Sequence, residues 1–142
     1  MLAADVILDT NVFVAAGFNQ RSASAYILAQ VRSGRLRMIW NEQTRRETRH
    51  ILDKIPPLSW SSVAELFRKE DCHHGEIAPE EFDFIPDPDD RKFAALSEAT
   101  GAVLLTNDDD LLSNRDRAGL EILTPRECWE RQHRLNGGKS SI

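Results

Sequence analysis

The sequence has only two cysteines, Cys72 and Cys128, and it has no apolar run long enough to cross a membrane. Two cysteines do not make the disulfide framework of a small secreted protein, so a reducing cytoplasm is the expected compartment. Near the N-terminus, Asp5 and Asp9 interrupt what would be the apolar part of an export signal. We therefore expect a cytoplasmic protein that does not associate with membranes.

Positive charge is also scarce. The 18 Lys and Arg residues are outnumbered by 23 Asp and Glu residues, which gives a formal net charge of −5. Nucleic-acid-binding proteins usually carry a basic excess, but this objection weakens if several acids bind cations. An apolar content of 41% in 142 residues fits one globular domain without structural metal or disulfides. We assign residues 1–136 to that domain and expect residues 137–142 to be a disordered tail.

The chain is organised around a short apolar run that ends in an acid. Residues 6–8 (Val-Ile-Leu) have the pattern of a strand buried on both faces of a parallel sheet. Asp9 follows at the end of that strand, where α/β proteins bind their ligands. Alternatively, Asp9 only caps the next helix. Which interpretation holds depends on whether other acids arrive at the same place.

Helical and strand patterns alternate along the rest of the chain. We expect helices at 22–31, 41–54, 59–70, 87–100 and from 124, helical or turn-like segments at 12–18 and 111–112, strands at 36–40, 102–105 and 120–123, and a short edge strand at 82–85. This alternation predicts a three-layer α/β/α sandwich with a mainly parallel central sheet.

Glu47 is the only charged side chain on the face of helix 41–54 that should pack inward. The same face carries Thr44, Thr48, Ile51, Leu52 and Ile55. Glu47 could be an edge residue paired with a neighbouring arginine, an interaction that contributes little to stability. It could equally point into a site, because burial of an unpaired carboxylate is costly. Periodicity leaves both interpretations open.

Two more acids are expected at the same edge of the sheet. Asp108 follows the apolar strand at 102–105, and Asp90 lies in the first turn of the helix that Asp87 caps. Asp90 could be no more than the acid of that cap, but it also borders the buried stripe of the helix. Helices that follow parallel strands begin where those strands end, so Asp9, Glu47, Asp90 and Asp108 should converge. Four close carboxylates need cations or protons, and oxygen ligands without His or Cys favour Mg²⁺ or Mn²⁺, as in nucleases.

Four motifs in a fixed order carry a family resemblance. They are Asp9-Thr10-Asn11, Glu47 in a helix, Asp87-Pro88-Asp89-Asp90 with Lys92-Phe93, and Thr106-Asn107-Asp108 with Asp110-Leu111-Leu112. In this order they resemble a PIN domain, and more narrowly the PIN-family toxins of bacterial type II toxin–antitoxin systems. With the closing strand and the helix start at 124–127, the resemblance covers residues 5–129.

The resemblance implies a PIN-like fold and a metal-dependent endoribonuclease that leaves 5′-phosphate and 3′-hydroxyl ends. The catalytic, metal-binding positions would be Asp9, Glu47, Asp90 and Asp108, with Asp110 as an auxiliary ligand. Thr106 matches a hydroxyl position beside the last acid, and Asn11 matches the polar residue after the first. The sequence departs from the subfamily at Asn107, where glycine or a basic residue is usual, and at 41–42, where Asn-Glu replaces Ser-Pro. A protein antitoxin and a homodimer are also implied.

Our hypothesis is hydrolysis of RNA by water that Mg²⁺ activates. Asp9, Asp90 and Asp108 would hold the metal, and Glu47 would ligate or orient a second ion ~4 Å from the first. Candidates for contacts to the RNA backbone are Arg45, Arg46, Arg49, Arg91 and Lys92, although each could simply belong to a solvated helix face.

Three other functions are considered. A phosphatase of the haloacid-dehalogenase type needs a second Asp two residues after the first, where this sequence has Asn11. A non-catalytic PIN-like module that binds RNA or an antitoxin would not need all four acids. A phosphoacceptor receiver domain would need a lysine after a late strand. Phe18 and Trp60 are candidates for self-association contacts or for the core.

Overall fold

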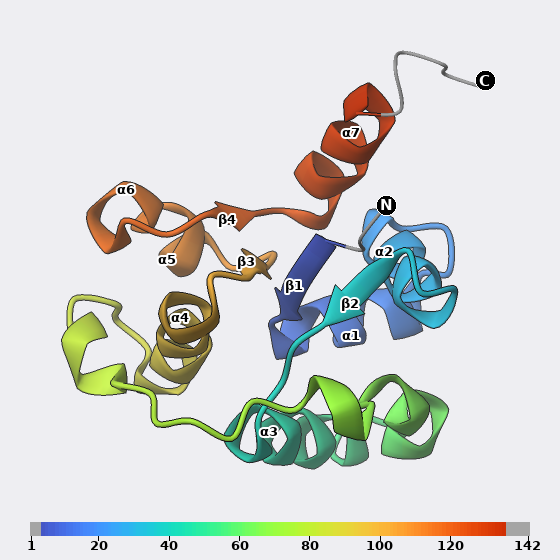
Figure 1. The fold of residues 1–142 in the computed structure, drawn as a ribbon. Coiled ribbons are helices and arrows are strands. Elements are labelled where there is room, and N and C mark those ends of the chain that lie inside the picture. The colour runs from blue at the N-terminus through green and yellow to red at the C-terminus, as the bar shows by residue number, and fades with distance from the viewer. Residues whose placement is uncertain (1–3, 136–142) are drawn as a thin grey trace.

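The computed structural model describes residues 4–135 and contains a four-stranded, fully parallel sheet in the order β2-β1-β3-β4 (Figure 1). The strands are β1 (Ala4–Leu8), β2 (Leu36–Met38), β3 (Val103–Leu105) and β4 (Ile122–Leu123). The α-helices are α1 (Thr10–Phe18), α2 (Ala23–Arg32), α3 (Glu42–Asp53), α4 (Pro88–Thr100), α5 (Asp109–Leu112), α6 (Arg115–Ala118) and α7 (Pro125–Leu135). The expected tail at 137–142 lies outside the described residues, and the domain boundaries stay a prediction.

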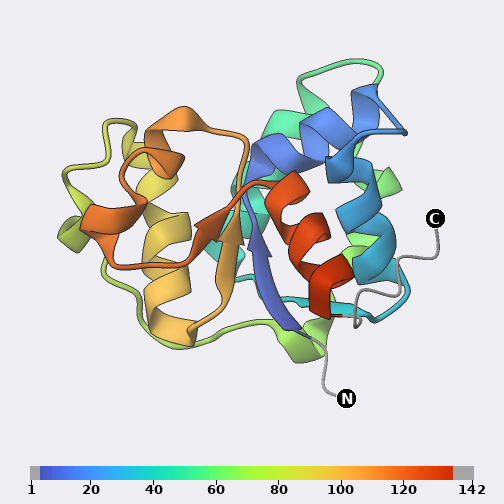
Figure 2. The ribbon, with the colours of Figure 1, turned by 90° about the horizontal axis from the view of Figure 1, so that it is seen from above.

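Alternating side chains of β1 pack into two separate apolar clusters, one on each face of the sheet. Val6 and Leu8 lie in the cluster formed with α1, α2 and α7, whereas Ile7 lies in the cluster formed with α4 and α5. Figure 2 shows α1, α2 and α7 on one side of the strands and α4 on the other. These two buried faces confirm the three-layer α/β/α sandwich. Within residues 4–135, no helix is both long and apolar enough to cross a membrane.

The register of the central strands sets where their polar ends emerge. Leu8 of β1 pairs with Leu105 of β3, and the backbone N–H of Asp9 donates to the carbonyl of Leu105 at 3.0 Å. The two strands therefore end at the same level of the sheet. The residues that follow these strands, Asp9 and Thr106, therefore lie side by side at the carboxyl edge of the sheet.

The expected helix at 59–70 is wrong. Three short 3-10 helices occupy this stretch: η1 (Trp60–Ser62), η2 (Ala64–Leu66) and η3 (Lys69–Asp71). The hydroxyl of Ser62 donates to the carbonyl of Ser59, the kind of local bond by which serine competes with an α-helix. Val63 and Leu66, whose spacing of three is helical, are buried, and Phe67 is half-buried against Phe13 at a ring distance of 5.6 Å. Burial was predictable here, but the helix type was not.

The expected edge strand at 82–85 is also wrong. The segment contains the end of the 3-10 helix η4 (Pro79–Phe82) and a turn in which Ile85 N–H donates to the carbonyl of Phe82. Both Phe82 and Ile85 are buried in the cluster formed with α4. The apolar residues at 82 and 85 are therefore buried against α4 because a turn, and not a strand, directs both side chains inward.

Candidate metal centre

Three aspartates from distant parts of the chain meet at the carboxyl edge of the sheet. Asp9 follows β1, Asp108 caps α5 just after β3, and Asp90 lies in the first turn of α4. One carboxylate oxygen from each lies within 4.8 Å of the others. Asp9 is 3% exposed and Asp90 is 8% exposed, and Asp108 is half-buried. The structure thus brings three of the four predicted acids into one partly enclosed group.

The Thr106 hydroxyl fixes two of these aspartates at once. Its Oγ1 donates to Oδ2 of Asp9 at 2.7 Å and accepts from the backbone N–H of Asp108 at 2.9 Å. Thr106 has no exposed surface, so these bonds do not compete with solvent. The side chain therefore sets the spacing between the acid after β1 and the acid after β3.

Asn11 connects the first motif to the last. Its Nδ2 donates to Oδ2 of Asp9 at 3.1 Å, and its Oδ1 accepts from the backbone N–H of Asn107 at 3.1 Å. The Asn107 side chain in turn donates to Oγ of the buried Ser24 at 3.1 Å. The residue that departs from the subfamily pattern thus anchors its turn to α2. Because Asn11 is an amide, the site lacks the second acid that a haloacid-dehalogenase-type phosphatase requires.

Burial and mutual repulsion raise the pKa values of two of the aspartates. For Asp9, burial raises the pKa from 3.8 to about 6, with added repulsion from Glu47 and Asp108, and the bond from Thr106 lowers it in part. For Asp90, burial is again the largest cause, followed by the close Asp108 carboxylate and the charge of Asp9, and its pKa lies well above its usual range. The ionised cluster is therefore unfavourable without a counter-charge.

The residues present fit a hard divalent cation. Oδ2 of Asp90 is buried and has no hydrogen-bond partner among the described residues, although a buried acceptor is normally satisfied. The donor set consists of three carboxylates with no histidine or cysteine, which favours Mg²⁺ or Mn²⁺. Across residues 4–135, no other group of three potential ligands lies so close together.

Glu47 lies beside the three aspartates but not among them. The Asn41 side chain caps α3 by accepting from the N–H of Thr44 at 2.9 Å, so a cap replaces the usual Ser-Pro start. One turn later, Glu47 is half-buried, with Oε2 accepting from Oγ1 of Thr10 at 2.8 Å. Its Oε1 lies 2.6 Å from Nζ of Lys92. Glu47 is thus paired, as one interpretation expected, but with a lysine of α4.

Thr10 and Lys92 carry contacts that the sequence did not indicate. In the sequence, Thr10 stands out only as part of the first motif, and Lys92 only as part of the third motif and as a candidate for contact with RNA. Thr10 is 37 residues from Glu47, and no local pattern links side chains at such a separation. The adjacency of Thr10 to Asp9 was the one available signal.

Asp110 lies outside the aspartate group. Its side chain is exposed, and its backbone N–H donates to Oδ1 of Asp108 at 2.9 Å. The contribution of this residue in the structure is therefore a backbone bond that orients Asp108. Its role as an auxiliary metal ligand stays a prediction.

The candidate RNA-binding side chains divide into engaged and exposed ones. Arg45 makes two bonds of 3.1 Å to Glu42, and Arg91 donates to backbone carbonyls of the segment before α4. Arg46 and Arg49 are exposed on α3, where Arg49 Nε lies 4.0 Å from Oδ2 of the exposed Asp53, and both arginines line a shallow hollow with His50 and Lys54. Of the five candidates, these two arginines present the most accessible positive charge.

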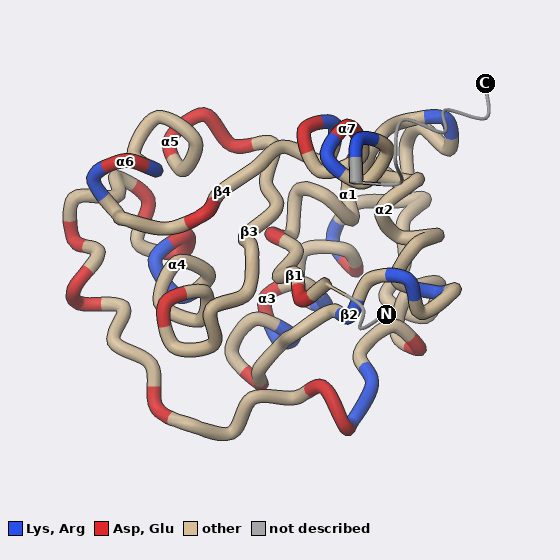
Figure 3. Tube along the Cα trace, turned by 45° about the horizontal axis from the view of Figure 1, so that its top comes forward, with Lys and Arg blue, Asp and Glu red and all other residues tan. Residues whose placement is uncertain are grey.

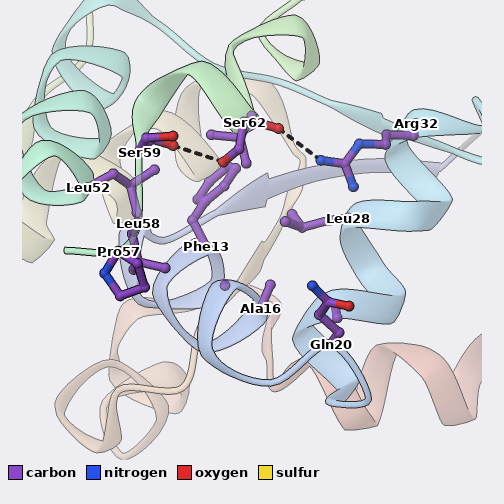
Figure 4. A pocket seen from close by; sticks show the side chains of 13 residues that line it. Phe13, Ala16, Gln20, Leu28, Arg32, Leu52, Pro57, Leu58, Ser59 and Ser62 are labelled. Atoms are coloured by element: carbon purple, nitrogen blue, oxygen red, sulfur yellow. Dashed lines mark hydrogen bonds between the residues drawn. The ribbon is translucent and has the colours of Figure 1, made fainter. Parts of the chain in front are cut away.

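A separate hollow, lined by both apolar and polar side chains, lies between α1, α2 and the segment at 57–63 (Figure 4). Phe13, Leu28 and Leu58 line it, and Arg32 closes one side by donating to the carbonyl of Ser62 at 3.1 Å. None of the predicted acids lines this hollow.

Of the two aromatic candidates for self-association, only Phe18 is clearly on the surface. Phe18 is 58% exposed at the end of α1, whereas Trp60 packs against Phe67 at a ring distance of 4.7 Å.

Comparison with known proteins agrees with this geometry. A family model described as PIN domain matches residues 5–110, which include all three clustered aspartates and Glu47. No match was found among curated proteins. The matched region is 106 of the 142 residues, so it covers most of the chain and every strand but β4. The chain belongs to the PIN-domain family.

Proposed function

We propose that this protein is an endoribonuclease that uses Mg²⁺ or Mn²⁺ to hydrolyse RNA phosphodiester bonds. Membership of the PIN-domain family indicates a nuclease fold. The observation that carries the proposal is the convergence of Asp9, Asp90 and Asp108, where the buried Asp90 Oδ2 has no hydrogen-bond partner in the described part of the chain. Repulsion among these close carboxylates is costly, and a divalent cation would offset it directly.

The residues of the chain have distinct proposed roles. Asp9, Asp90 and Asp108 would hold the ion, and Thr106 and Asn11 keep the Asp9 carboxylate in place through Oδ2. When bound, the ion supplies Lewis acidity that activates water and neutralises charge on the phosphate. Glu47 adds negative charge beside the centre and belongs to the catalytic set in this proposal.

The RNA backbone would be held mainly from α3. Arg46 and Arg49 are exposed on the helix that also carries Glu47, and they are the proposed contacts for RNA phosphates. The other three candidates already make contacts within the fold: Arg45, Arg91 and Lys92. If one of them bound RNA, it would either share these contacts with the RNA or break them.

We further propose that the protein is the toxin of a toxin–antitoxin pair and forms a homodimer. The support is the resemblance of the four ordered motifs to that group of PIN-domain toxins. Growth arrest on expression in bacteria, relieved by the Asp108→Asn substitution, would support a toxin role. Normal growth with active enzyme in the cell would contradict it.

The nuclease proposal is tested by cleavage of fluorescent RNA with purified protein. We expect cleavage with Mg²⁺ or Mn²⁺, no cleavage in excess EDTA, and a loss of at least 100-fold in Asp108→Asn, because one ligand of the ion is removed. Asp109→Asn is the matched control, since its side chain is exposed and adjacent but outside the aspartate group. Full activity of Asp108→Asn, or cleavage in EDTA, would refute the proposal.

A further inference from the structure

Lys92 forms a close ion pair at the edge of the candidate metal centre. Its Nζ lies 2.6 Å from Oε1 of Glu47, and the two side chains are only 17% and 18% exposed. The same Nζ donates to the carbonyl of Asp89 at 2.7 Å. The pair joins α3 to α4, and Lys92 lies two residues beyond Asp90 in that helix.

Glu47 differs from the three aspartates in that its charge is already compensated. Oε1 faces the ammonium, and Oε2 accepts from the buried Thr10 hydroxyl, which itself lies 3.1 Å from Oγ1 of Thr48. In contrast, Oδ2 of Asp90 is buried without a partner among the described residues. The negative charge of Glu47 is therefore balanced by Lys92, whereas the charges of the aspartates are left for a bound cation to balance.

We propose that Lys92 is a built-in cation that takes the place of a second divalent ion at Glu47, so that the centre binds one ion rather than two. The inference rests on the proposed function, because it assumes that the aspartates bind a divalent ion. A second ion beside Glu47 would have to displace the ammonium or lie next to a like charge. With one ion bound and Lys92 in place, the four acids would be balanced by two cations, one of which the chain itself supplies.

Lys92 would then act as a positioning residue with a further use. An ammonium has three N–H donors, and the structure gives this one two acceptors, the Glu47 carboxylate and the Asp89 carbonyl. The third donor has no acceptor within residues 4–135 and would be available to a phosphate oxygen of the RNA. Lys92 would hold Glu47 in place and add attraction for the phosphate, tasks for which other enzymes use a second metal.

The test is the number of Mn²⁺ ions bound per chain, measured from the loss of the free-Mn²⁺ electron paramagnetic resonance signal. We expect one ion for the wild type and two for Lys92→Met, because loss of the ammonium exposes the Glu47 carboxylate. Lys92→Arg keeps the charge and should bind one. Lys92→Met combined with Glu47→Gln should return the count to one. Lys69→Met is the matched control, since Lys69 is exposed on η3, and it should bind one.

Two failures can be told apart. Two ions bound to the wild type, or one ion bound to a Lys92→Met variant with an unchanged circular dichroism spectrum, would overturn the role of Lys92 and leave the nuclease proposal standing. No Mn²⁺ bound to the wild type would overturn the metal centre itself. If Lys92→Met does not fold, the wild-type count and Lys92→Arg still decide, because two ions in either overturn the inference.

Discussion

Asp9→Asn should stabilise the metal-free protein at neutral pH even though it removes a proposed metal ligand. In the wild type, burial and nearby acids raise the Asp9 pKa from 3.8 to about 6. The ionised carboxylate therefore costs folding free energy at pH 7.5. An asparagine has nearly the same shape and keeps an oxygen that can accept from Thr106 and Asn11, but it carries no charge.

The magnitude follows from the shift. About two pKa units correspond to about 3 kcal/mol, since each unit is worth 1.36 kcal/mol. For an acid whose pKa is raised in the folded state, stability is full below the unfolded pKa and falls as the pH rises through the folded one. The stability lost through ionisation of Asp9 is therefore lost as the pH rises from about 4 to about 6. At about 3–4 °C per kcal/mol, the Asp9→Asn substitution, which abolishes this loss, would raise Tm by up to roughly 10 °C.

The assay is thermal unfolding of EDTA-treated protein from pH 4 to pH 8. The wild type should lose stability with rising pH, and Asp9→Asn should lose less of it, with the remainder due mainly to Asp90. At pH 7.5, Mg²⁺ should raise the wild-type Tm and have a much smaller effect on the variant, because a ligand that binds only the folded state stabilises it. Asp109→Asn is the control and should behave as the wild type. A metal-free variant that is less stable than the wild type at pH 7.5 would refute the electrostatic reasoning.

Two further predictions concern the surroundings of the centre. Thr106→Val removes the hydroxyl that joins Asp9 to Asp108, and we expect a loss of about 1–3 kcal/mol in unfolding free energy and a 10- to 100-fold weaker Mg²⁺ affinity, measured by denaturation and calorimetry; unchanged affinity would contradict the positioning role. The double change Arg46→Ala and Arg49→Ala should weaken RNA binding and reduce the slope of log K against log salt by about 1.4, as for two lost phosphate contacts; an unchanged slope would exclude them.

The parts of the fold with strong local signals were predictable from sequence. The apolar runs of β1 and β3 are buried strands, and the Asp87-Pro88 start and the Gly101 end bound α4 as expected, with Gly101 at a φ of 75° that few other residues adopt. The stretch from 59 to 71 has a helical apolar spacing, but serine hydroxyls and packing against Phe13 divide it into 3-10 turns. Neither the serine hydrogen bonds nor the contact with Phe13 can be read from the spacing of apolar residues.

In the candidate site, too, some features were predictable from the sequence and others depend on contacts between distant residues. The convergence of Asp9, Asp90 and Asp108 follows from parallel topology, because strand ends and the helix starts after them share one edge. The separation of Glu47 from this group did not follow. It depends on how closely α3 approaches α4, which places Lys92 against Glu47 across 45 positions of sequence (92 − 47). Helix periodicity showed which face Glu47 occupies, but it could not show which side chain from another element would meet that face.

The acidic excess of the chain and an RNA substrate are compatible once the charges are placed in space. Figure 3 shows acidic residues along the segment that leads into α4 and basic residues on α3. At the centre, Lys92 offsets Glu47, and a divalent ion would offset two of the three aspartate charges. The phosphate would then meet a nearly neutral centre. Local compensation, rather than the net charge of −5, would decide whether RNA approaches.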